Sequence, residues 1–229
     1  MENLQLRENE IFETLKSIKD NDFIVIGGYA VNAYTLPRFS VDCDIVIRNH
    51  KELKEIEKSL FKLDYKKVKN YSESDYHGKF ERYEKEISQG FRVSIDILIN
   101  EIIDRQTKSK FSADWVFENS KSRKLRGKTI NEELNLNIIN LEALFVMKFI
   151  SCRLTDIRDI FLLIGFVKDK SWIKKEVSKR YEFKNRLKIL IEEIDSKQFK
   201  DGLQGVFGFI DNKLFEKHKK MIYELANIK

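Results

Sequence analysis

The sequence contains few of the residues that cross-link a chain or bind zinc, because its 229 residues include only two Cys and three His. Two cysteines cannot make a disulfide framework. Cys43 and Cys152 both lie among apolar residues, so we expect them to be buried thiols. His50, His77 and His218 show no ligand spacing and indicate no zinc site. No motif of a nucleophilic serine or cysteine is present either.

Long apolar runs and low-complexity linkers are also missing. No apolar run reaches the length of a membrane span, and the N-terminal segment MENLQLRENE is acidic and lacks an apolar signal core. We therefore expect a cytoplasmic protein with no membrane partner. Hydrophobic residues make up 42% and charged residues 35% of the chain, which is typical of a folded globular protein. Its length allows one large domain or two lobes around a shared cleft.

The net charge of +6 is unevenly distributed along the chain. Residues 1–140 carry 24 basic and 24 acidic side chains, so the whole excess lies in residues 141–229. A local basic cluster also falls within residues 105–128; its members are Arg105, Lys108, Lys110, Lys121, Arg123, Lys124, Arg126 and Lys128. Such a distribution attracts a polyanion, and the alternative is a solvated surface of lysine-rich helices.

The pattern of apolar residues divides the chain into two parts. The first part mixes strands with helices, and we expect helices at 3–19, 29–35 and 51–62, strands at 23–26, 42–47, 80–87 and 91–99, an edge strand at 65–71 and one or two short strands within 121–139. The second part is helical, with expected helices at 141–151, 156–167, 171–179, 182–194, 199–210 and 213–227. We expect an α+β fold with a catalytic domain over 1–140 and a helical domain over 141–229.

The most informative segment joins a glycine pair to two acids. Gly27 and Gly28 follow an apolar run, and a glycine turn that leads into a helix presents backbone N–H groups to an anion. Asp42 and Asp44 open the strand 42–47 and point to the same face, whereas Val41, Cys43 and Ile45 point into the core. Paired carboxylates can hold a divalent cation. A cation beside a phosphate-binding glycine turn is the arrangement that nucleotidyl transfer requires. The alternatives are a plain tight turn and exposed charges on an edge strand.

These residues resemble the DNA polymerase β type of nucleotidyltransferases, and most closely the AbiEii-like abortive-infection toxins of toxin–antitoxin systems. The resemblance rests on Gly27-Gly28 and on Arg38-x-Ser40-x-Asp42-x-Asp44. It implies a mixed sheet with flanking helices, followed by a helical bundle lobe. It also implies a third acid on a later strand, which would be Asp96, although that carboxylate could instead pair with an arginine.

A second block, at residues 141–163, resembles the same group more loosely. It supplies Lys148, Arg153, Asp156, Arg158 and Asp159. The resemblance implies that Lys148 contacts a phosphate, whereas a lysine on an apolar helix can also snorkel to solvent. Asp156 and Asp159 share a helix face and could favour the helix dipole or order Lys148 or Arg153, and Asp156 could itself be the cap.

The resemblance implies a metal-dependent transfer of NMP from an NTP such as ATP to an acceptor. Asp42, Asp44 and Asp96 would be the catalytic and metal-binding residues, with Mg²⁺ or Mn²⁺ as the cofactor. The phosphates of the NTP would contact Gly27, Gly28, Arg38, Ser40 and Lys148; the alternative for Arg38 is a pair with an acid. We expect a tRNA-like RNA as the acceptor and an antitoxin as a partner. The alternatives are a small-molecule acceptor of the antibiotic type, or a nucleotide-binding or RNA-binding protein that keeps the fold without turnover.

Overall fold

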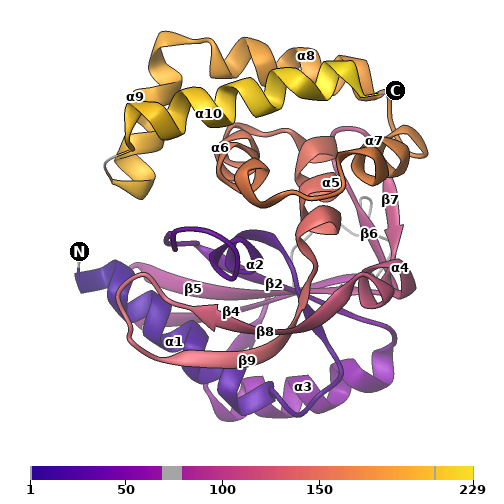
Figure 1. Cartoon of the computed structure of the whole chain (residues 1–229). Coiled ribbons are helices and arrows are strands. Elements are labelled where there is room, and N and C mark those ends of the chain that lie inside the picture. Colours follow the sequence, from indigo (N-terminus) through magenta and orange to yellow (C-terminus); the bar gives the residue numbers. More distant parts are fainter. Residues whose placement is uncertain (1, 69–78, 209, 229) are drawn as a thin grey trace. The chain divides into compact units, whose positions relative to one another are not determined.

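The computed structural model describes residues 2–68, 79–208 and 210–228, and the chain divides into two compact units (Figure 1). The sheet unit comprises residues 1–33, 37–103 and 110–139. The helical unit comprises residues 34–36, 104–109 and 140–229. The fold is the α+β arrangement that the sequence predicts, a mixed sheet with flanking helices followed along the chain by a run of helices.

The helices of the sheet unit are α1 (Glu2–Ile18), α2 (Gly27–Asn32), α3 (His50–Lys62) and α4 (Ala113–Glu118). Its strands are β1 (Ile24–Val25), β2 (Asp42–Ile47), β3 (Lys66–Lys67), β4 (Phe80–Ser88), β5 (Phe91–Ile99), β6 (Glu101–Ile103), β7 (Lys110–Ser112), β8 (Ser120–Arg126) and β9 (Glu133–Ile139). Seven of them form one sheet in the order β3-β4-β5-β2-β1-β9-β8, while β6 and β7 form a separate pair. β2 runs parallel to β5 and β1 runs parallel to β9; the other neighbours are antiparallel.

The helices α1 and α3 pack on the same side of this sheet (Figure 1). The spacing of apolar residues explains their placement, because Ile11, Leu15 and Ile18 fall on one face of α1 and are fully buried. The helix α3 is capped by Asn49, whose side chain accepts hydrogen bonds from the backbone N–H groups of Lys51 and Glu52. This packing covers one face of the sheet.

Several predicted positions need correction. Val41 precedes β2 and is 61% exposed, so it does not enter the core. The first turn of α2 includes Gly27 and Gly28 themselves, and the helix ends at Asn32 rather than at residue 35. The edge strand predicted at 65–71 is limited to β3, and residues 69–71 lie outside the described part of the chain. The short elements β6, β7 and α4 were not predicted, because three-residue strands carry too little alternation and a six-residue helix too few turns to detect.

The helical unit contains α5 (Leu141–Ser151), α6 (Leu154–Leu163), α7 (Lys170–Ser178), α8 (Phe183–Ile194), α9 (Lys197–Phe207) and α10 (Asn212–Tyr223), with short 3-10 turns η1 (Ile164–Phe166) and η2 (Glu224–Asn227). The helix α5 begins where Asn140 accepts a hydrogen bond from the backbone of Ala143, and it is buried along most of its length. Among the described residues, no helix is long and apolar enough to cross a membrane.

An aromatic cluster forms the core of the helical unit. The ring of Phe161 lies 5.2 Å from that of Phe199 and 4.9 Å from that of Phe215, measured between centroids. His218 is buried beside them, with Nδ1 2.8 Å from the carbonyl oxygen of Phe161. Burial lowers the pKa of His218, so its neutral imidazole serves as a core side chain.

Candidate active site

The three predicted acids lie on one face of the sheet unit. β2 and β5 pair in parallel, and the register sets Asp44 directly opposite Asp96 and sets Asp42 opposite Ser94. Because residues two apart on a strand share a face, Asp42, Asp44 and Asp96 all face the same way. On the other face of β2, Cys43 and Ile45 are fully buried, as predicted. The sheet therefore brings together carboxylates that lie up to 54 positions apart in the sequence.

Asp96 is engaged by an arginine. Arg82 donates from Nε to Oδ1 of Asp96 at 2.7 Å and from Nη2 to Oδ2 at 2.5 Å, which is a bidentate pair. The same Nη2 lies 3.6 Å from Oδ2 of Asp42. The side chain of Asp96 is 6% exposed, that of Arg82 20% and that of Asp42 39%. The alternative that Asp96 pairs with an arginine is thus present in the structure, and Arg82 is a site residue that the sequence pattern did not single out.

The glycine pair lies against the acid strand. Gly27 has φ +66°, and a Cβ atom placed there would lie 2.0 Å from Oδ2 of Asp44. A Cβ atom at Gly28 would lie 2.4 Å from Oγ of Ser40 and 3.2 Å from Nη2 of Arg38. Both positions therefore need glycine, one for its backbone conformation and both for the close approach. The contacts bring Gly27 and Gly28 together with two of the predicted phosphate-binding side chains.

The buried side chain of Asn32 holds the segment that carries Arg38 and Ser40. Its Nδ2 donates to the carbonyl oxygen of Arg38 at 2.9 Å, and its Oδ1 accepts from the backbone N–H of Arg38 at 3.1 Å. The guanidinium of Arg38 donates to the carbonyl oxygen of Phe39 at 3.1 Å. These bonds set the path of the chain from α2 into β2.

Lys148 belongs to the helical unit, where it is buried and paired with two acids. Its Nζ lies 2.8 Å from Oδ1 of Asp156 and 2.8 Å from Oδ2 of Asp159, and the residue is 7% exposed. The snorkelling alternative is therefore wrong, and Asp156 and Asp159 order Lys148. Burial alone would raise the pKa of Asp156, but the Lys148 ammonium and the Arg153 guanidinium outweigh it and hold that pKa well below its usual range.

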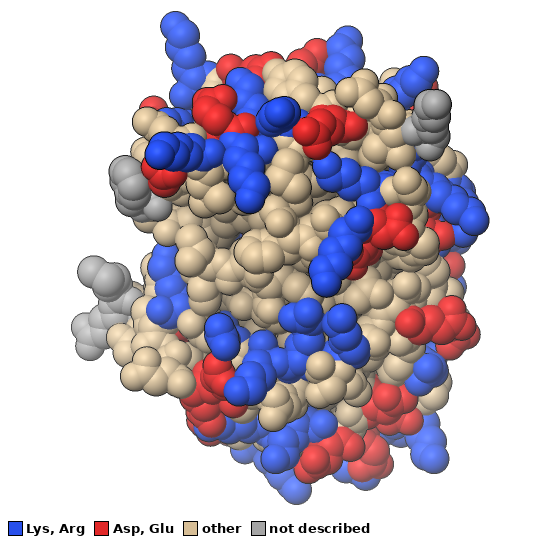
Figure 2. Space-filling model, in the orientation of Figure 1, with Lys and Arg blue, Asp and Glu red and all other residues tan. Residues whose placement is uncertain are grey.

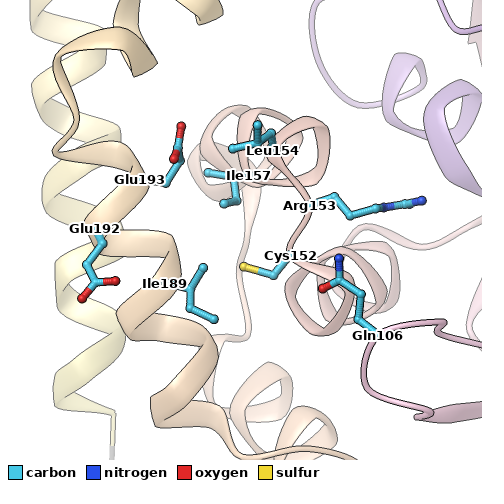
Figure 3. Close-up of a pocket in the computed structure, with 8 residues that line it drawn as sticks. All are labelled: Gln106, Cys152, Arg153, Leu154, Ile157, Ile189, Glu192 and Glu193. Atoms are coloured by element: carbon cyan, nitrogen blue, oxygen red, sulfur yellow. The ribbon is translucent and has the colours of Figure 1, made fainter.

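Asp156 is not the cap of α6, because the helix begins after Arg153 and Asp156 stands three residues further on. Its carboxylate accepts from the backbone N–H of Arg153 at 3.3 Å and from the Nε of Arg153 at 2.7 Å. This contact explains why α6 begins at Leu154 and not at residue 156. Arg153 and Cys152 also line a cavity of about 470 Å³ in the helical unit (Figure 3). Burial raises the pKa of the Cys152 thiol to about 11, so it stays protonated at neutral pH.

The predicted metal site depends on how its donor side chains are arranged. In residues 2–68, 79–208 and 210–228, no group of three or more His, Cys, Asp and Glu side chains is arranged to hold a metal ion. The donor chemistry nevertheless suits a hard divalent cation, because Asp42, Asp44 and Asp96 are carboxylates on one face. The oxygens of Asp96 face a guanidinium in this structure. The predicted Mg²⁺ or Mn²⁺ stays a prediction.

The basic cluster at 105–128 does not form one patch within either unit, because Arg105 and Lys108 belong to the helical unit and the others to the sheet unit. Lys124 and Arg126 both pair with Glu133, at 2.7 Å and 2.8 Å. Figure 2 shows Lys and Arg side chains spread over the face in view, with Asp and Glu side chains among them. The sequence cluster is therefore partly neutralised in the fold.

Two solved structures of other proteins are similar to this chain. MenT4, a nucleotidyltransferase toxin from Mycobacterium tuberculosis H37Rv, has a TM-score of 0.61 at 13% identity, over 99% of this chain and 85% of that chain. This likeness shows the fold. A putative nucleotidyltransferase from H. pylori has a TM-score of 0.45 at 14% identity, over 100% of this chain and 93% of that chain. No curated protein matches the sequence significantly.

The family assignment rests on nearly the whole chain. The model of the AbiEii family, described as nucleotidyl transferase toxins of type IV toxin–antitoxin systems, matches residues 11–227. The match spans both units, so it includes the acids of the sheet unit and Lys148 of the helical unit. The chain therefore belongs to the AbiEii family of nucleotidyltransferase toxins and is a nucleotidyltransferase.

Proposed function

We propose that this nucleotidyltransferase transfers an NMP from an NTP to an RNA acceptor in a reaction that needs a divalent cation. The observation that carries the proposal is the register of β2 and β5, which pairs Asp44 with Asp96 and places Asp42 on the same face. Three carboxylates on one face concentrate negative charge, and in a partly exposed site this charge favours a cation. Bound Mg²⁺ or Mn²⁺ would neutralise the triphosphate and the leaving pyrophosphate.

The residues of the sheet unit supply binding and orientation in this proposal. Asp42 and Asp44 would hold the cation, and Asp96 would help to bind it and accept the proton of the attacking hydroxyl. The close approach of Gly28 to Ser40 and Arg38 places a backbone segment, a hydroxyl and a guanidinium together, which suits the phosphates of an NTP. Lys148 would add a further phosphate contact while its ammonium group also pairs with Asp156 and Asp159.

The charge distribution supports RNA as the acceptor. The whole excess of positive charge lies in residues 141–229, and exposed lysines are common on the helices of this segment. RNA phosphates supply most of the affinity for such a surface. A small-molecule acceptor of the antibiotic type would instead favour an acidic pocket. As a toxin of a toxin–antitoxin pair, the protein would be opposed by an antitoxin.

A transfer assay tests this proposal. The protein is incubated with each α-labelled NTP in turn, with Mg²⁺ or Mn²⁺ and total RNA, and the label on RNA is measured. We expect one NTP to label an RNA species, with no labelling by the Asp44→Asn variant or after removal of the cation with EDTA. Label that appears only on small molecules or on protein would exclude the RNA acceptor. Transfer that persists in EDTA would exclude the role of the cation.

A further inference from the structure

Arg82 completes a row of charges across three adjacent strands of the sheet unit. The pairing of β4 with β5 sets Arg82 opposite Asp96, and the pairing of β5 with β2 sets Asp96 opposite Asp44. Across the sheet, the positive side chain of Arg82 is therefore followed by the negative side chains of Asp96 and Asp44. The guanidinium binds both oxygens of Asp96, and its Nη2 lies 3.6 Å from Asp42. Arg82 thus contacts two of the three carboxylates that would bind a divalent cation.

The burial of Asp96 makes this pairing necessary in the absence of another cation. A buried carboxylate is strongly disfavoured unless an opposite charge and hydrogen bonds compensate it. Asp96 is 4% exposed, and Arg82 supplies both the charge and the hydrogen bonds. A divalent cation that approached Asp96 would meet the positive charge of Arg82. Binding of the cation and the Arg82–Asp96 pair therefore compete.

In a nucleotidyltransferase, the triphosphate of the NTP can bind a guanidinium that has been displaced from Asp96. The planar fork of arginine matches phosphate as well as it matches carboxylate, because both offer two oxygens at a suitable spacing. We propose that Arg82 exchanges partners during substrate binding: it holds Asp96 in the free protein and binds the triphosphate of the NTP once a divalent cation has taken Asp96. This inference rests on the proposed function, and it names the residue that links the cation to the nucleotide.

The exchange predicts that cation and nucleotide each strengthen the binding of the other. The cation removes Asp96 from Arg82 and so frees the guanidinium for phosphate, while the phosphate draws Arg82 away from Asp96 and so opens the site to the cation. Such coupling is reciprocal by thermodynamic necessity. A purely structural role for Arg82, as a clamp that only keeps Asp96 in place, predicts no coupling.

Direct binding measurements on Arg82→Gln separate the two roles. Binding of Mn²⁺ is followed by electron paramagnetic resonance, first without nucleotide and then with each NTP in turn. Without nucleotide, we expect Arg82→Gln to bind Mn²⁺ about tenfold more tightly than the wild type, because the variant lacks the guanidinium that competes with Mn²⁺ for Asp96. With Mn²⁺ present, we expect the variant to bind the NTP about tenfold more weakly. Arg92→Gln is the matched control, since Arg92 is an exposed arginine of β5 that pairs with Glu84 at 3.3 Å.

A second variant covers the case in which Arg82→Gln does not fold. Asp96→Asn removes the charge that holds Arg82, so we expect this variant to bind NTP without any divalent cation more tightly than the wild type does. The double variant Arg82→Gln/Asp96→Asn should lose that gain. If Asp96→Asn binds NTP without a cation no better than the wild type, or if Arg82→Gln loses Mn²⁺ binding and keeps NTP affinity, Arg82 is only a clamp.

The same data distinguish a failure of this inference from a failure of the proposed function. If the wild type binds Mn²⁺ and an NTP but the variants show no coupling through Arg82, only the partner exchange is wrong. If the wild type binds neither Mn²⁺ nor any of the four NTPs, both the proposed function and the partner exchange are wrong.

Discussion

A Cβ atom at Gly27 would lie 2.0 Å from Oδ2 of Asp44, so the backbone of α2 directly abuts a predicted catalytic carboxylate. The residue also has a positive φ of +66°. Any side chain at this position must therefore displace Asp44 or shift the helix, and it must also adopt a strained backbone conformation.

The first prediction follows from this contact. We expect Gly27→Ala to lose about 1–3 kcal/mol in the free energy of unfolding and to lose nucleotide transfer even when folded. Gly90→Ala is the matched control, because Gly90 has a similar φ of +73° but a Cβ atom placed there would meet no atom of the described residues within 4 Å. The control should lose stability and keep activity per folded molecule. Equal activity per folded molecule in both variants would contradict the prediction that the close approach of Gly27 to Asp44 is needed for transfer.

The second prediction concerns the acids themselves. We expect Asp44→Asn to slow nucleotide transfer at least about a hundredfold, because the lost charge no longer stabilises the bound cation and the transition state. Asp42→Asn should act in the same direction. The circular dichroism spectrum should not change, since Asp42 and Asp44 are both partly exposed. A wild-type rate in Asp44→Asn would place the active site elsewhere.

The third prediction concerns the buried ion pairs of Lys148. We expect Asp156→Asn to lower the free energy of unfolding at pH 7 by about 3 kcal/mol, because the buried Lys148 and the nearby Arg153 lose a partner charge. Asp195→Asn is the control; Asp195 is exposed and pairs with Lys219 at 2.7 Å, and its loss should have little effect. Urea denaturation measures the free energy of unfolding of both variants.

The stability difference between the wild type and Asp156→Asn should depend on pH with a definite sign. The pKa of Asp156 is lower in the folded chain than in the unfolded chain, so the folded chain binds this proton less readily. The contribution to stability is therefore complete above about pH 4 and decreases as the pH falls further. We expect the stability gap between the wild type and Asp156→Asn to narrow below that pH. A gap that widened there would contradict the lowered pKa.

The fourth prediction tests the RNA acceptor. Lys213, Lys217 and Lys220 are exposed on α10, and their combined change to Glu should weaken RNA binding while leaving NTP affinity unchanged. The plot of log affinity against log salt concentration should become less steep. The magnitude of its slope should decrease by about 2, because each lost phosphate contact to a single strand contributes about 0.7. The control makes the same charge change at exposed Lys51, Lys54 and Lys58 of α3. An equal effect in both variants would indicate non-specific attraction only.

The fifth prediction concerns the cysteines. Burial raises the pKa of the Cys43 thiol well above its usual value and that of Cys152 to about 11, so both should be protonated and poorly accessible at pH 8. We expect Ellman's reagent to react slowly with the native protein and to detect both thiols after unfolding in guanidinium chloride. A rapid reaction of one thiol in the native protein would show that its site opens readily.

Local patterns in the sequence determined much of this protein. The alternation in residues 42–47 predicted β2 with its observed bounds and placed Asp42 and Asp44 on one face. The Asn140 cap and the apolar run after it are local signals that account for the observed bounds of α5, which the periodicity predicted. Local signals suffice in these cases, because strand alternation and helix capping involve only residues near one another in the chain.

The tertiary structure alone decided which distant residues meet. Asp44 and Asp96 become neighbours because β2 and β5 pair in parallel across the intervening α3, β3 and β4, and no local signal sets that register. The antiparallel pairing of β4 with β5 selects Arg82, among many basic residues, as the partner of Asp96. Lys148 is buried and held by Asp156 because α5 and α6 pack together. Burial raises the cost of an unpaired charge, so packing rather than composition determines each ion pair.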